Sequence, residues 1–217
     1  MSRTQLARVA GALYLLVAAC GGWAELVVRS RIKVPGDAVA TAANVVEHAS
    51  LMRLAFAADL VNITCFLMVA LVMFAILRPV NGAIAVAMVA FNATAVAIMG
   101  VNMLHHLGAL LVATVPAYTS GLTAETASAL VLLLLDLHGH GYHVAQIFYG
   151  LWLLPLGYLV YRSGAFPRLL GVLLMMGCGG YLGALVAPSL AEVLAWPAGL
   201  AEISFLLWLL VRGAKAT

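Results

Sequence analysis

Long runs of apolar residues alternate with short polar segments along this chain. A helix needs about 20 mainly apolar residues to cross a hydrocarbon core about 30 Å thick. Six runs approach or exceed this length, and we expect membrane spans at about 9–28, 51–77, 83–113, 142–161, 167–187 and 193–211. Turn-forming residues separate them, such as Arg-Pro-Val-Asn-Gly at 78–82. The pattern predicts an all-α, polytopic transmembrane helical bundle, with one integral membrane domain covering residues 1–217.

Two segments depart from this pattern. The polar stretch 29–50 contains a Pro-Gly-Asp sequence, which predicts a turn leading into a short helix capped by Asp37. Residues 123–138 predict a helix that is too short to cross by itself and is followed by Gly139 and Gly141. A single helix through both glycines and the fourth span would be about 60 Å long. We therefore expect a break at the glycines and a partial or re-entrant helix before them.

Composition supports lipid as the solvent of the folded chain. Hydrophobic residues make up 65% of it and charged residues only 9%, against roughly 25% charged in an ordinary soluble domain. No soluble core hides that much apolar surface, so the bilayer is the expected partner. The net charge of +3 is small and its cations are scattered, which argues against nucleic-acid binding. Composition leaves the oligomeric state open.

Basic residues at the ends of the spans predict the orientation. If the N-terminus is cytoplasmic, seven Lys and Arg residues lie on the inner side and four on the outer side. The inner set is Arg3, Arg8, Arg78, Arg162, Arg168, Arg212 and Lys215. Cytoplasmic loops carry the excess of positive charge in membrane proteins. We therefore expect both termini in the cytoplasm.

Ionisable residues inside the spans are the first candidates for function, because a charge in hydrocarbon is costly. Glu25 and Arg29 are four residues apart and are expected to form a structural ion pair. Asp59 and Glu202 lie deeper in their spans and have no basic residue one turn away. For these two, locking of neighbouring helices and a proton or ligand site are both open interpretations. In an enzyme, they are the candidate catalytic acid or base.

Histidines form two clusters expected on the same, outer side. The clusters are His105 with His106, and His138 with His140 and His143. His138 and His140 would converge only if the helix breaks at the glycines, because residues two apart face different sides of a helix. Imidazoles joined by a carboxylate such as Asp136 suit zinc or another transition metal. We rank a haem held between the clusters below such a metal, and ordinary interfacial histidines are the competing interpretation.

Several short segments resemble a known family. They are Ala-Arg-Val-Ala-Gly-Ala-Leu-Tyr at 7–14, Val-Arg-Ser at 28–30, Gly-Asp-Ala at 36–38, Gly-Tyr-Leu at 157–159, Arg-Ser-Gly at 162–164 and Trp-Leu-Leu at 208–210. Together they resemble the bacterial domain-of-unknown-function family 4386 over nearly the whole chain. The resemblance implies a multi-pass protein of the bacterial cytoplasmic membrane and assigns no catalytic residue.

Three functions fit these observations. The leading hypothesis is metal or ligand binding in an outward-facing polar pocket, extended to chemistry on a small or lipid-like substrate in the membrane. A small proton-coupled transporter that uses Asp59 and Glu202 is the second, and a non-catalytic subunit or scaffold of a membrane complex is the third. P-loop and Gly-x-Ser-x-Gly sequences are missing, which disfavours soluble-type nucleotide and hydrolase chemistry.

Overall fold

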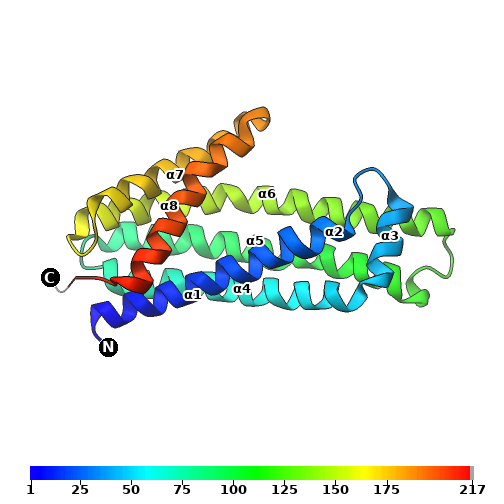
Figure 1. Cartoon of the computed structure of the whole chain (residues 1–217), viewed down its shortest axis with the longest axis horizontal. Helices are drawn as coiled ribbons and strands as arrows, with labels where there is room; N and C mark the ends of the chain where they lie inside the picture. The colour runs from blue at the N-terminus through cyan, green and yellow to red at the C-terminus, as the bar shows by residue number, and fades with distance from the viewer. Residues whose placement is uncertain (216–217) are drawn as a thin grey trace. The chain divides into compact units, whose positions relative to one another are not determined.

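The computed structural model describes residues 1–215, apart from the side chains of Pro188, Ala191, Glu192 and Ala195. Every regular element within residues 1–215 is a helix (Figure 1). Five helices are long and apolar enough to cross a membrane: Arg3–Ile32, Ala49–Leu77, Gly82–Thr114, Ala124–Ser163 and Arg168–Val186. The predicted class, an all-α protein with membrane-spanning helices, is confirmed.

The first of these helices contains a π-helical turn. It begins as α1 (Arg3–Trp23), continues as the π-helix η1 (Ala24–Arg29) and ends as α2 (Ser30–Ile32). In a π-helix each N–H bonds to the carbonyl five residues earlier, an arrangement that is rare and frequent at functional sites. Glu25 and Arg29 both lie in η1. The turn therefore decides where these two side chains point.

The polar segment after the first helix forms a short helix, α3 (Ala38–Glu47). Its first turn is capped by Asp37, whose Oδ1 accepts a hydrogen bond from the backbone N–H of Ala40 at 2.9 Å. Gly36 has φ +77°, a left-handed conformation that glycine adopts without strain. The predicted turn and cap are confirmed.

The longest helix passes through the two glycines. After α4 (Ala49–Leu77), α5 (Gly82–Thr114) and the 3₁₀ turn η2 (Pro116–Tyr118), the chain forms α6 (Ala124–Ser163) without interruption. The predicted break is therefore wrong: the predicted partial helix at 123–138, from residue 124 on, and the predicted span at 142–161 belong to one helix. Gly141 has a packing reason instead: a Cβ there would overlap the side chain of Asn102 on α5. Glycine lowers helix stability by about 1 kcal/mol relative to alanine, too little to end a well-packed helix.

The C-terminal part consists of α7 (Arg168–Val186), the 3₁₀ turn η3 (Pro188–Leu190) and α8 (Ala191–Val211). Helices α7 and α8 pack against each other (Figure 1). The predicted sixth span corresponds to α8. Its described apolar stretch, Trp196–Val211, is shorter than the about 20 residues of a full crossing. The sixth crossing stays a prediction.

The helices form two compact units. Unit 1 comprises 1–16, 64–97 and 143–217, and unit 2 comprises 17–63 and 98–142. In unit 1, Trp152 is fully buried and packs edge-on against Phe66, with ring centroids 5.0 Å apart. In unit 2, a cluster of buried apolar side chains from the first helix, α3, α4, α5 and α6 includes Ile32, Met52 and Leu135. The expectation of a single membrane domain stays a prediction.

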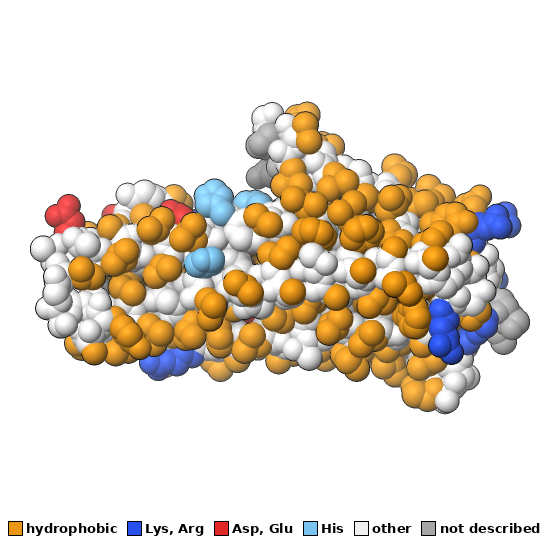
Figure 2. Space-filling model, turned by 180° about the vertical axis from the view of Figure 1, so that it is seen from behind, with side chains coloured by type: hydrophobic (Ala, Val, Ile, Leu, Met, Phe, Trp, Pro, Cys, Tyr) orange, Lys and Arg blue, Asp and Glu red, His pale blue; other side chains and the backbone are white. Residues whose placement is uncertain are grey.

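The surface is apolar, as a lipid environment requires. Large hydrophobic side chains such as Leu26, Val101 and Leu169 are 65–75% exposed. Figure 2 shows hydrophobic side chains over most of the visible face, with few charged groups among them. In water such a surface would drive aggregation, whereas in a bilayer it faces hydrocarbon. These features are those of an integral membrane protein.

Candidate metal centre

Three buried side chains from three helices meet in unit 2. They are Asp59 on α4, His106 on α5 and His138 on α6. One ligand atom from each lies within 4.8 Å of the others, and each residue is at most 4% exposed. Buried polar groups are costly unless they have partners. Their contacts therefore decide whether this cluster is only structural.

Arg29 links this cluster to the π-helical turn. Its Nη1 lies 2.6 Å from Oδ2 of Asp59, and its Nε lies 2.6 Å from Oε2 of Glu25. Arg29 is 9% exposed, and two carboxylates surround its guanidinium. A buried ion pair is stable only when geometry and additional hydrogen bonds offset the loss of hydration. The three groups together carry a net charge of −1, which favours a cation nearby.

The hydrogen bonds of the two histidines fix the tautomer of each neutral ring. Nε2 of His106 lies 3.0 Å from the backbone oxygen of Met52, and Nδ1 of His138 lies 3.4 Å from that of Asn102. A carbonyl oxygen only accepts, so in the neutral rings these nitrogens carry the protons. His106 Nδ1 and His138 Nε2 then carry lone pairs. Among the described residues, neither buried nitrogen has a hydrogen-bond partner.

This arrangement matches that of metal-binding histidines. Such a histidine usually donates its second ring N–H to a carbonyl or carboxylate, which fixes the tautomer and aims the free nitrogen at the metal. An apolar side chain packs on one of these histidines: the ring centroid of Phe56 lies 5.9 Å from that of His106. The imidazoles of His106 and His138 contact edge to face, with centroids 5.6 Å apart.

Asn102 holds α5 and α6 together at this point. Its Nδ2 donates to the backbone oxygen of His138 at 2.8 Å, while Oδ1 lies 3.0 Å from Nδ1 of His105. Asn102 is buried, and Gly141 gives its side chain the space it occupies. The contact between Asn102 and His138 therefore runs in both directions, side chain to backbone and backbone to side chain. It positions the imidazole of His138.

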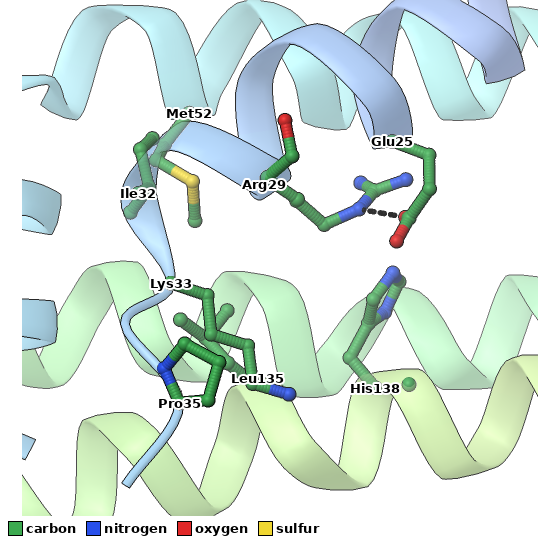
Figure 3. Close-up of a pocket in the computed structure, with 10 residues that line it drawn as sticks. Glu25, Arg29, Ile32, Lys33, Pro35, Met52, Leu135 and His138 are labelled. Atoms are coloured by element: carbon green, nitrogen blue, oxygen red, sulfur yellow. Dashed lines mark hydrogen bonds and ion pairs between the residues drawn. The ribbon is translucent and has the colours of Figure 1, made fainter. Parts of the chain in front are cut away.

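A pocket of about 300 Å³ opens beside the cluster. Its lining residues are Glu25, Arg29, Ser30, Ile32, Lys33, Pro35, Met52, Leu135, His138 and Gly139. Figure 3 shows the imidazole of His138 directed toward the ion pair of Arg29 and Glu25, with Ile32, Lys33, Met52 and Leu135 at the other end. His138 belongs to both pocket and cluster, and Arg29 lines the pocket and pairs with Asp59 of the cluster. A ligand in the pocket therefore has access to the cluster through His138.

The remaining predicted ligands lie outside the cluster. Asp136 forms an ion pair with Lys33 at 2.6 Å. His140 is exposed, and so is His143, whose Nδ1 lies 3.0 Å from Oε1 of Gln146. Because α6 is continuous, His140 points about 200° away from His138 around the helix axis. His105 is partly buried and contacts Asn102 instead.

Glu202, the other predicted acid or base, lies in unit 1 with different partners. Its Oε1 accepts a hydrogen bond from the hydroxyl of Tyr14 at 2.6 Å, and its Oε2 accepts one from Tyr181 at 2.8 Å. Both carboxylate oxygens therefore have partners within the protein. These tyrosines come from α1 and α7.

Sequence reasoning missed several partners. It paired Arg29 with Glu25 alone, although the unbalanced Asp59 on the next span was a signal that one cation could serve two carboxylates. It did not connect Lys33 with Asp136 or the tyrosines with Glu202, because no spacing along one helix reports contacts between helices. The carbonyl oxygen of Met52 carries no sequence signal at all.

Comparison with known proteins places the chain in a family. The model of the family described as domain of unknown function 4386 matches residues 9–213. The chain belongs to this family. A protein of Archaeoglobus fulgidus, described as uncharacterized, is 34% identical over 77 residues, which cover 33% of this chain and 46% of that protein. The match thus spans less than half of the relative. No solved structure matches the chain.

Proposed function

We propose that this membrane protein binds a divalent transition metal ion, with zinc as the first candidate, through Asp59, His106 and His138. The observation that supports this most is the pair of buried imidazole nitrogens whose tautomers are fixed by carbonyl oxygens and which have no hydrogen-bond partner among the described residues. Histidine nitrogens and a carboxylate oxygen are the ligands of many zinc sites. The net charge of −1 on Glu25, Arg29 and Asp59 favours a cation further.

The size of the cluster fits such an ion after a small contraction. With bonds of about 2.0–2.2 Å, the ligand atoms of a tetrahedral zinc lie about 3.3 Å apart. The three candidate atoms lie within 4.8 Å of one another, so side-chain movements of about 1 Å bring them into place. A haem fits less well, because the edge-to-face contact of the two imidazoles leaves no space for a flat macrocycle between them.

Three protein ligands leave a coordination position open. Catalytic zinc sites have this composition, whereas structural sites are closed by four protein ligands. A metal held in this way supplies Lewis-acid chemistry or an activated water to a substrate in the adjoining pocket. We therefore propose that the bound metal carries out chemistry on a membrane-embedded substrate.

Metal analysis of single variants tests the proposal. Protein purified without chelators and dialysed against zinc should contain about one equivalent, and His106→Ala and His138→Ala should lose it. The matched controls are His105→Ala, His140→Ala and His143→Ala, which change histidines outside the cluster and should keep the metal. An empty wild-type protein, or loss of metal only in the control variants, would contradict the proposal.

We further propose that the protein lies in the bacterial cytoplasmic membrane with both termini in the cytoplasm. The excess of Lys and Arg on the predicted inner side supports this orientation. With an impermeant maleimide added to intact cells, a cysteine introduced in the loop at 33–37 should react, whereas one introduced near the N-terminus should react only after the membrane is permeabilised. Labelling of both from outside would contradict the orientation.

A small proton-coupled carrier is the second candidate, and Glu202 favours it. A membrane carboxylate held by two tyrosyl hydroxyls is a group that can exchange a proton with its neighbours. Proteoliposomes with a pH-sensitive dye inside should then show proton uptake that Glu202→Gln abolishes and His106→Ala leaves unchanged. Equal uptake by wild type and Glu202→Gln would remove this candidate.

A further inference from the structure

We propose that the pocket beside the metal centre binds a small amphiphile, with a carboxylate head group that coordinates the metal and a medium-length apolar chain. This inference rests on the proposed metal site and adds the chemical class of its ligand. It draws on the division of the pocket into two ends, on its volume and on the charges around it.

The pocket has a polar end and a mainly apolar end. Glu25, Arg29 and His138 lie together at one end, and Ile32, Met52 and Leu135 lie at the other, where the side chain of Lys33 runs beside Leu135 (Figure 3). The apolar side chains belong to the buried core of unit 2, so they form a fixed wall. A ligand that fills both ends must itself be polar at one end and apolar at the other.

The volume limits the length of the apolar part. The pocket measures about 300 Å³, at the small end of the range of about 300–1,000 Å³ for ligand sites. A single medium-length chain fits such a space, whereas the two long chains of a membrane phospholipid do not. Specificity for one short chain follows from this limit.

The charges around the pocket favour a head group with one negative charge. Arg29 and Lys33 contribute two positive charges, and their ion-pair partners Glu25, Asp59 and Asp136 contribute three negative charges. The sum is −1, and a divalent metal changes it to +1. A monoanion in the open coordination position then neutralises the site. A carboxylate meets this requirement and is also a good ligand for zinc and cobalt.

Cobalt spectroscopy tests this inference directly. Wild-type protein in nanodiscs, loaded with Co²⁺, should show a saturable change in its visible absorption when octanoate is added, because the carboxylate enters the metal's coordination sphere. Acetate has the same head group without the chain, and its affinity should be at least about 100-fold lower. Octanol has the same chain without the charge, and it should leave the spectrum unchanged. Palmitate binding more tightly than octanoate would indicate a membrane-derived ligand and overturn the limit on chain length.

Gly139 offers a variant that blocks the pocket without disturbing the metal. This glycine lines the pocket, and a Cβ built on it meets no atom within 4 Å. Gly139→Leu should therefore fold, retain cobalt and lose the octanoate response by at least about 10-fold. The matched control is Gly199→Leu on α8, a glycine that also has open space but does not line the pocket. It should retain both cobalt and the response.

The outcomes separate the two proposals. A wild-type protein that binds cobalt but shows no octanoate response overturns the amphiphile inference and leaves the metal site intact. An unchanged response in Gly139→Leu overturns the assignment to this pocket. Failure of the wild-type protein to bind cobalt, measured by elemental analysis, overturns the proposed metal function and this inference with it.

Discussion

The surroundings of Asp59 and Glu202 differ in one instructive respect. Asp59 faces a full positive charge on Arg29 and two histidines, each of which has one nitrogen with no partner among the described residues. Glu202 faces two neutral hydroxyls, and each of its oxygens accepts one of them. Glu202 is thus satisfied by the protein, and within the described residues the buried atom without a partner near it is a donor, Nε1 of Trp152, whose ring packs 6.2 Å from that of Tyr14. Beside Asp59 the two free histidine nitrogens are acceptors, which can bind a cation.

This difference shows that polarity inside a membrane is a weak criterion for a binding site. Both carboxylates are polar groups in apolar helices, and sequence analysis gave them equal standing. What separates them is the number of lone pairs left over after the protein's own hydrogen bonds are formed. The predictions below test this contrast between the two regions.

The largest effect is expected at Arg29. Arg29→Met removes the cation and leaves Asp59 buried beside Glu25, which should destabilise the protein by about 3–5 kcal/mol and lower its melting temperature in detergent. Replacing both partners, Arg29→Met with Asp59→Leu, should recover most of this loss. The exposed Arg31→Met is the control. Equal melting temperatures for Arg29→Met and Arg31→Met would mean that the ion pair contributes nothing to stability.

A smaller loss is expected around Glu202. Tyr14→Phe and Tyr181→Phe each remove one hydrogen bond to the carboxylate, which should reduce stability by about 1.5–3 kcal/mol in each variant. Zinc content should stay at the wild-type level, because neither tyrosine contributes to the candidate metal centre. Tyr158→Phe, at a partly exposed position, serves as the control. Loss of zinc in Tyr14→Phe would show that the two regions are coupled and end the contrast.

Gly139 and Gly141, both on α6, should respond to substitution in opposite directions. Gly141→Ala places a methyl group where the side chain of Asn102 lies, so it should destabilise the protein by about 1–3 kcal/mol and reduce zinc content. Gly139→Ala meets open space and should stabilise it by about 0.5–1 kcal/mol. Thermal melting and metal analysis of both variants measure this. Similar behaviour of the two would contradict the packing role of Gly141.

The smallest effects are expected at the exposed histidines of α6. His140→Ala and His143→Ala should change stability by less than about 0.5 kcal/mol, as is usual for surface positions. Zinc affinity, measured by competition with a chromogenic chelator, should match that of the wild-type protein. A clear loss of affinity in either variant would place a ligand outside the cluster of Asp59, His106 and His138.

The fold was largely predictable because hydropathy depends only on composition within a segment. Spans at 51–77 and 83–113 differ from α4 and α5 by a few residues. The helix α6 was misjudged because glycine was interpreted as a signal of backbone flexibility. At Gly141 the missing side chain serves the approach of Asn102, a contact between residues far apart in sequence that no local pattern reports.

For the candidate centre, the sequence predicts the set of candidate residues but not which of them lie together. Both histidine clusters and Asp59 were identified as candidates, and the structure selects one histidine from each cluster. Which one depends on helix rotation: one residue turns a side chain by about 100°, enough to separate the buried His106 from the half-buried His105. The carboxylate of the cluster comes from Asp59 on α4, whereas Asp136 pairs with Lys33.

The π-helical turn accommodates one extra residue without turning the helix that follows it to another side. A π turn holds about one residue more than an α turn, so the six residues Ala24–Arg29 turn the chain about as far as five residues of an α-helix, at about 100° each. Deleting a single residue between Glu25 and Arg29 would restore an ordinary α-helix and leave Arg29 on the side that faces Asp59. A relative with such a deletion would keep the contact between its arginine and Asp59, and its glutamate would lie three residues from that arginine in place of four.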